Sequence, residues 1–448
     1  MVVLGVMRRA VFAAVFLLLF LASCAVEGPR ALAPSPSPSA VALPQPIPQP
    51  ITRTSSAAQV AWFWTFMQPN NKRALVGVDS GGAIVASFDD AMLAPTIGFW
   101  RSADGASIYL ATRDRITAYS ALTGKEDRSY TKTAGGIVAS AFSPDGRWLA
   151  LLTPAPEPRI DLLDLRSGIW QSEPASHDPN AQLPGMGGNI ASVVWATLAF
   201  ADSAHLYLLM DWGGPMRLTS YLIAADKLTQ VATAVHGQDG RQFSSCAGPA
   251  VATKVVADGE VLVVFCHYDG AVSFFGLTKL TSLGVVQSGQ KNPFWLSPIF
   301  TPDGQLLYLH NPPDFGDAMQ VIDLRTRAML GPVPTPTKLG GPGPFSWLMP
   351  IAFAGGVAST QPISPDGLRL YSDTSDGIVV LRVPDLKPIA KLATGTPINE
   401  IWVSGDGRTV YAGGGDRKSL VIAKDDGTGV KTVPLPFEIG GFIASEHG

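Results

Sequence analysis

The stretch Ser143-Pro144-Asp145-Gly146-Arg147-Trp148-Leu149-Ala150 carries the pattern that decides the fold. An Asp-Gly pair ahead of an apolar run indicates a tight hairpin, because glycine adopts a positive φ at little cost. The pattern returns at Thr301-Pro302-Asp303-Gly304, Ser364-Pro365-Asp366-Gly367 and Ser404-Gly405-Asp406-Gly407. Each copy is followed by a short apolar run that contains Trp or Tyr. The chain therefore contains an internal repeat.

Weaker copies of this turn, here called the anchor turn, complete the repeat. The seven anchor aspartates, which recur every 40–63 residues, are Asp104, Asp145, Asp202, Asp258, Asp303, Asp366 and Asp406. After each anchor come a short strand, a polar break, a second strand and another turn, as in residues 160–163 closing at Ser167-Gly168. Each unit therefore holds four antiparallel strands, and no helical period competes outside the N-terminus. Such units predict an all-β chain folded as a β-propeller.

The quoted motifs resemble those of the YVTN and WD-repeat-like bacterial propellers. The shared features are Ser-Pro-Asp-Gly, an aromatic-rich strand, and then an apolar strand that closes at a turn such as Thr123-Gly124-Lys125 or Ser167-Gly168. The resemblance covers about residues 60–448. It implies the propeller fold and no particular activity, because many unrelated functions share this fold.

The two ends of the repeat region indicate how the ring closes. Residues 62–66, 74–79 and 83–87 predict strands two, three and four of a unit that lacks its first strand. The C-terminal residues 441–448 predict the missing first strand. One composite blade would then close the ring and give eight blades. Seven, the commoner number in this family, is the alternative if one weak unit is a loop.

The N-terminus predicts export and lipidation. Arg8 and Arg9 precede an apolar run over residues 10–21, which is the length of a signal-peptide core. The run ends in Leu21-Ala22-Ser23-Cys24, which resembles the bacterial lipobox and implies cleavage before Cys24 and acylation of that residue. An ordinary signal peptide with a chance cysteine is the alternative. We therefore expect an exported protein, lipid-anchored to the cell membrane and facing outside the cytoplasm.

The predicted domain boundaries follow from composition. Residues 1–23 are the signal peptide, 24–58 are the lipidated cysteine and a Pro/Ser-rich linker, and 59–448 are the propeller. The linker has nothing to bury and favours extended polyproline geometry. With 33 Lys and Arg against 36 Asp and Glu and no basic run, a nucleic-acid partner is not expected.

Signatures of catalysis and of metal or cofactor binding are absent from the sequence. It contains no Gly-x-Ser-x-Gly elbow, Walker loop, His-Glu-x-x-His or Cys-x-x-Cys-His motif, so neither a metal nor a cofactor is expected. Asp373 and Asp376, near Gly377, do not have the spacing of an EF-hand and are interpreted as a solvated turn. The anchor aspartates are interpreted as structural, because Asp at such turns accepts hydrogen bonds from nearby backbone.

The connections between strands sort onto two faces of the expected ring. Strands one and two, and strands three and four, are joined by short turns on what we call the anchor face. Strands two and three, and successive blades, are joined by longer segments on the opposite, elaborated face, where function is expected to concentrate. The candidate binding residues on this rim are Trp212, Arg241, His267, Tyr268, Asp269, His310, Phe315 and Arg417.

These observations favour a non-catalytic role. The leading hypothesis is a membrane-anchored lipoprotein whose propeller binds or scaffolds a protein or carbohydrate partner. The alternative is an enzyme of the quinoprotein-dehydrogenase or lactonase kind, both of which resemble this fold. Several carboxylates or histidines converging on one point would favour the enzyme, and a broad apolar and aromatic rim would favour the binder.

The two remaining cysteines are expected to form a disulfide after export. Cys246 lies in a segment that enters a blade, and Cys266 ends the second strand of that blade. Counting back through the Asp258-Gly259 hairpin places Cys266 opposite about residue 251, so the segment carrying Cys246 must bend back to bring the two together. Two buried free thiols are the alternative.

Overall fold

The computed structural model divides into two units, residues 1–42 and 43–448, and every residue described here belongs to the second. The described residues are 59–67, 72–89, 93, 98–102, 104–131, 136–153, 158–175, 195–211, 217–224, 226–235, 251–256, 261–266, 270–277, 279–288, 297–310, 318–334, 363–374, 377–395 and 397–442.

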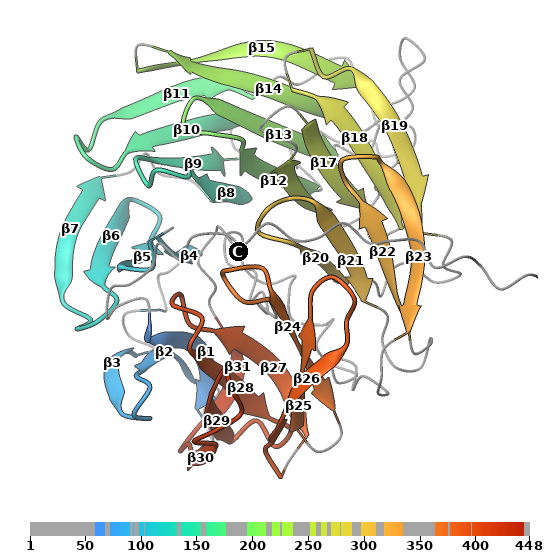
Figure 1. The fold of residues 1–448 in the computed structure, drawn as a ribbon. Coiled ribbons are helices and arrows are strands. Elements are labelled where there is room, and N and C mark those ends of the chain that lie inside the picture. Colours follow the sequence, from blue (N-terminus) through green and yellow to red (C-terminus); the bar gives the residue numbers. More distant parts are fainter. Residues whose placement is uncertain are drawn as a thin grey trace, which may run out of the picture. The chain divides into compact units, whose positions relative to one another are not determined.

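Eight antiparallel sheets, arranged as a β-propeller, make up the described part of the chain (Figure 1). Four complete blades come first, and the first of them contains β4 (Gly98–Arg101), β5 (Ser107–Ala111), β6 (Arg115–Ser120) and β7 (Glu126–Thr131). The second contains β8 (Ala139–Phe142), β9 (Trp148–Thr153), β10 (Arg159–Asp164) and β11 (Trp170–Pro174). The third contains β12 (Trp195–Phe200), β13 (His205–Asp211), β14 (Arg217–Ala224) and β15 (Lys227–Val235), and the fourth contains β16 (Val251–Val256), β17 (Val261–Cys266), β18 (Ala271–Gly276) and β19 (Ser282–Gln287).

Three further blades follow in chain order. They are β20 (Ser297–Phe300) to β23 (Ala328–Pro334) with β21 (Leu306–His310) and β22 (Ala318–Asp323); β24 (Arg369–Thr374), β25 (Gly377–Arg382) and β26 (Pro388–Ala393); and β27 (Ile398–Val403) to β30 (Lys431–Pro434) with β28 (Thr409–Gly414) and β29 (Ser419–Lys424). In the second of these, an isolated bridge between Ile363 and Leu370 stands where the other blades have their first strand.

The eighth blade joins the two ends of the propeller, as the sequence predicts. Its strands are β31 (Glu438–Phe442), β1 (Ala61–Met67), β2 (Lys72–Val78) and β3 (Ile84–Phe88), and β31 pairs with β1. Eight blades and the composite closure are thus confirmed. The closing strand begins at Glu438, earlier than the predicted 441–448, because Ile439 already packs into the core; residues 443–448 lie outside the described residues.

The anchor turns owe their shape to side-chain hydrogen bonds. In the second complete blade, the Ser143 hydroxyl donates to Asp145 over 2.6 Å, and the Arg147 N–H donates to the same carboxylate over 3.1 Å. Gly146 has a φ of 66°, which favours glycine. Matching Ser–Asp bonds recur at Ser102, Ser364 and Ser404. The anchor aspartates of these turns are therefore structural, as expected from the sequence.

The core lies between neighbouring blades as well as within them. Five blades place a buried tyrosine at the third position of the second strand: Tyr109, Tyr207, Tyr308, Tyr371 and Tyr411. Burial raises the pKa of each of these phenols. Trp100 and Trp148 are buried in clusters that span two blades, so both contribute to packing between blades. The side chain of Trp195, and all of Trp295, lie outside the described residues.

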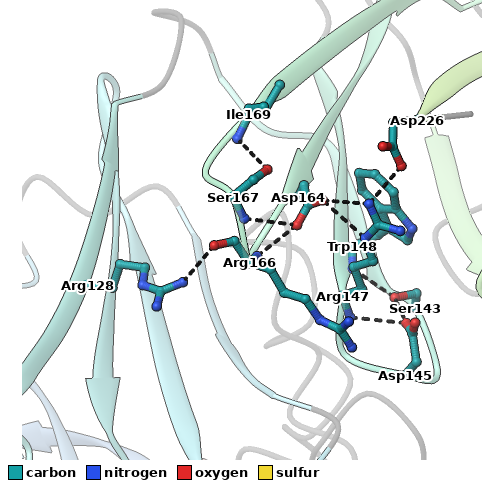
Figure 2. A network of polar contacts seen from close by, with 10 residues as sticks. All are labelled: Arg128, Ser143, Asp145, Arg147, Trp148, Asp164, Arg166, Ser167, Ile169 and Asp226. Atoms are coloured by element: carbon teal, nitrogen blue, oxygen red, sulfur yellow. Dashed lines mark hydrogen bonds and ion pairs between the residues drawn. The ribbon is translucent and has the colours of Figure 1, made fainter.

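Ion pairs join blades across the anchor face (Figure 2). The Arg147 guanidinium donates twice to Asp164 of its own blade, over 2.9 and 3.1 Å, and once to Asp226 of the next blade over 2.7 Å. It also lies over the Trp148 ring, 4.3 Å from the centroid. Arg369 makes a similar link between Asp366 of its own blade and Asp425 of the next. These contacts tie two pairs of neighbouring blades together on the anchor face.

Candidate functional site

The strand bounds confirm the sorting of connections onto two faces. On the anchor face, connections are short, as at 143–147 and 165–169 in one blade. The longest connections join strand ends on the elaborated face: residues 175–194, 236–250 and 335–362. The ring of strands thus carries its longest connections on one side, which is the usual location of binding residues.

Most of the predicted rim lies outside the described residues. Trp212, Arg241, His267, Tyr268, Asp269 and Phe315 fall there, as do Cys24 and Cys246. His310 is the last residue of β21 and Cys266 the last residue of β17, so both backbones reach the elaborated face. Cys266 pairs with Val251, the register expected from hairpin counting. The disulfide itself stays a prediction.

Arg417 is the rim residue whose contacts are described, and it lies where the ring closes. It connects β28 to β29 with a φ of 57°, and its N–H donates to the Gly414 carbonyl over 2.8 Å. Its own carbonyl accepts the Ile439 N–H of β31 over 2.7 Å. Beside it, Lys418 lies 3.9 Å from Glu438 of that strand. Arg417 therefore belongs to the joint between the last blade and the composite blade.

A carboxyl group that the sequence did not single out lies at the same joint. Glu400 of β27 accepts the Phe442 N–H of β31 over 3.0 Å, so its side chain spans from one blade to the next. Burial raises the pKa of Glu400 to about 7, although the Phe442 hydrogen bond and the Arg417 charge oppose the shift. Such a raised pKa marks either a structural joint or a functional site. The signal in the sequence was a lone acid among apolar residues, Ile-Asn-Glu-Ile-Trp-Val.

A second unusual carboxyl group corrects one interpretation of the sequence. Asp373 is not part of a solvated turn: it lies within β24, next to the elaborated face, and is half-buried. Burial raises its pKa to about 7. β24 packs against β27, so Asp373 and Glu400 stand on neighbouring blades, whereas Asp376 lies outside the described residues.

Two further kinds of feature are absent from the described residues. There, no three His, Cys, Asp or Glu side chains gather closely enough to hold a metal ion. Within the same ranges, no helix has the length and apolar character needed to cross a membrane.

Comparison with solved structures supports the propeller. The chain is similar to the dihydro-heme d1 dehydrogenase NirN in complex with DHE, with a TM-score of 0.55 and 16% identity over 91% of this chain and 79% of that one. It also matches the C-terminal WD40 domain of Sif2, with a TM-score of 0.49 and 13% identity over 80% of this chain and 90% of that one. No protein-family model and no curated protein matches the sequence. At these identities the likeness shows the fold alone.

Proposed function

We propose that the protein is a lipid-anchored binding module: acylated Cys24 holds it to the membrane outside the cytoplasm, and the elaborated face of the propeller binds a protein or carbohydrate partner. One observation carries the proposal. Short turns and ion pairs between neighbouring blades make up the anchor face, while the longest connections join strand ends on the opposite face. Rigid presentation of long, polar and aromatic segments lowers the ordering cost of binding.

The chemistry of the predicted rim suits recognition of a large partner. Tyr268, Trp212 and Phe315 would supply aromatic contact area, and Arg241 and His267 would supply hydrogen bonds. Aromatic side chains also stack on the apolar faces of sugars, so the same composition fits a carbohydrate. Their spread over several blades favours a broad contact over a single small pocket.

The test is capture of partners from the native envelope after mild crosslinking, with matched variants. The rim variant Trp212→Ala/Tyr268→Ala/Phe315→Ala removes aromatic area from the elaborated face. The control variant Arg325→Ala/Arg408→Ala removes two exposed side chains from anchor-face turns. We expect the wild type and the control to capture one partner equally. The rim variant should bind that partner at least about thirtyfold more weakly, the ratio that corresponds to one hot spot of about 2 kcal/mol. Equal capture by all three proteins would contradict the proposal.

The two raised carboxyl pKa values favour a second candidate, an enzyme of the quinoprotein-dehydrogenase or lactonase kind. Asp373 and Glu400 on neighbouring blades could exchange protons near neutral pH. Turnover of a lactone panel, or dye reduction with an alcohol and sugar panel, would be measured with the Asp373→Asn/Glu400→Gln variant as control. Activity that this variant loses, with its folded structure intact, would favour the enzyme over the binder.

A further inference from the structure

Five exposed apolar side chains occupy one region of the propeller. Each lies in the turn between the third and fourth strands of a blade, or within the first two residues of that fourth strand, on the anchor face. These residues, here called the apolar belt, are Ile84, Leu122, Ile169, Leu283 and Ile389, and they are 51, 38, 63, 37 and 52% exposed. Two other exposed apolar residues, Val231 and Val285, lie further along their strands.

The positions of the belt residues determine what shape of partner can contact all of them. Single exposed apolar residues are ordinary on protein surfaces. The belt residues, however, come from five different blades and stand at similar positions in them, at the anchor-face end of the fourth strand. A globular partner would touch one or two of them, whereas a flat surface can touch them all. The belt therefore fits a planar partner.

Cationic side chains accompany four of the five belt residues. Lys125 follows Leu122 in its turn, and Arg166 precedes Ile169. Lys279 precedes Leu283, Lys387 precedes Ile389, and all four cations are exposed. Two of them have an acidic neighbour: Lys387 pairs with Asp385 over 3.6 Å, and Glu126 follows Lys125. Apolar side chains beside Lys or Arg suit the boundary between phosphate headgroups and acyl chains of a lipid bilayer.

The tether would meet the propeller on this same face. The first described residue, Gln59, donates from its side chain to Asp406 over 3.0 Å, and its carbonyl accepts the Tyr411 hydroxyl over 2.6 Å. Asp406 belongs to an anchor turn, so Gln59, the described residue nearest to Cys24 in sequence, lies at the anchor face. A lipid on Cys24 would keep this face at a high effective concentration beside the bilayer, where individually weak contacts suffice.

We infer that the anchor face rests on the lipid surface through the apolar belt, and that the elaborated face points away from the membrane toward its partner. This orientation rests on the proposed lipid anchor at Cys24 and goes beyond it, because the anchor alone would leave the propeller free to tumble. It also gives the two faces separate tasks, docking on one side and recognition on the other.

The experiment is lysine footprinting with an acylating reagent and mass spectrometry, on full-length lipidated protein bound to vesicles of phosphatidylethanolamine and phosphatidylglycerol. The Cys24→Ala protein in solution is the reference. Lys125 and Lys387 report on the anchor face, and Lys418 reports on the elaborated face; Lys387 and Lys418 are 71 and 58% exposed. We expect Lys125 and Lys387 to react about fivefold more slowly on vesicles, while Lys418 keeps its solution rate.

Variants distinguish membrane contact made by the belt from membrane attachment through the lipid on Cys24. Ile84→Ser/Ile169→Ser/Ile389→Ser should restore the solution rate at Lys387 while the protein stays on the vesicles through its lipid. The matched control Val231→Ser/Val285→Ser, which removes exposed apolar residues outside the belt, should keep the protection. Equal labelling of both faces, or protection that the belt variant retains, would overturn the inference.

Failure of the anchor gives a different result from failure of the orientation. If the wild type does not float with vesicles and Cys24 takes up no acyl label, the proposed lipid anchor is wrong. The belt is then tested by mixing the unanchored chain with excess vesicles. The same pattern of lysine protection would support the orientation without the tether, and uniform labelling would reject it.

Discussion

Replacement of Phe442 by alanine tests the closure of the ring. Phe442 lies in the closing strand β31, is fully buried, and packs edge-on against Phe63 of β1, with ring centroids 5.7 Å apart. These two residues come from opposite ends of the described chain. Removing a buried phenylalanine ring costs about 3–5 kcal/mol through lost transfer energy and the cavity left behind. That loss is a large share of the roughly 5–15 kcal/mol by which a typical domain is stable.

The assay is urea unfolding of Phe442→Ala, Phe63→Ala and the double variant, followed by intrinsic tryptophan fluorescence. A lower midpoint with an unchanged slope would report lost stability. Because the two rings touch, the double variant should lose less than the sum of the single variants, by about 0.5–1.5 kcal/mol. Strict additivity, or a loss below about 1 kcal/mol for Phe442→Ala, the typical cost of an ordinary substitution, would refute the closure.

Three other outcomes are expected. Burial raises the pKa of Glu400 to about 7, above its ordinary 4.5, so the folded state binds the proton more tightly than the unfolded state. The free energy of unfolding should therefore fall as pH rises from about 4.5 to 7. Glu400→Gln should flatten that fall in urea midpoints measured from pH 4.5 to 8. Gly440→Ala should cost about 1–3 kcal/mol, because the added Cβ would lie 2.6 Å from the Trp64 ring; no loss in thermal unfolding would contradict that packing. Alkylation of denatured, unreduced protein should leave Cys246 and Cys266 unlabelled, whereas uptake at both would reject the disulfide.

The fold could be predicted from the sequence because one local signal repeats. Each Ser-x-Asp-Gly turn encodes its own hydrogen bonds, so Ser143 and Asp145 specify a hairpin without help from distant residues. Repetition of that signal then predicts the four-strand unit, and the composite blade at the two ends favours eight blades over seven. The start of the closing strand was less certain, since residues 438–442 depend on contacts with β1 and β27 that no local pattern reports.

The candidate site was less predictable, because its chemistry depends on contacts between blades. Glu400 is one acid in an apolar strand, and its raised pKa arises from burial once the neighbouring blades pack against β27. Asp373 was assigned to a solvated turn because Asp and Gly favour turns, yet its strand buries it. The apolar belt could not be predicted from the sequence either. Its members are spread over residues 84–389, and only the closed ring brings them to one face.

Photocrosslinking in the native envelope tests the central claim, that the elaborated face binds the partner, most directly. A photoreactive amino acid would replace Tyr268 on the predicted rim or, as a control, Arg325 in an exposed anchor-face turn. We expect position 268 to give a discrete crosslinked protein or glycan band, and position 325 to give none. The same bands from both positions, or a partner band from position 325 alone, would contradict the assignment of recognition to the elaborated face.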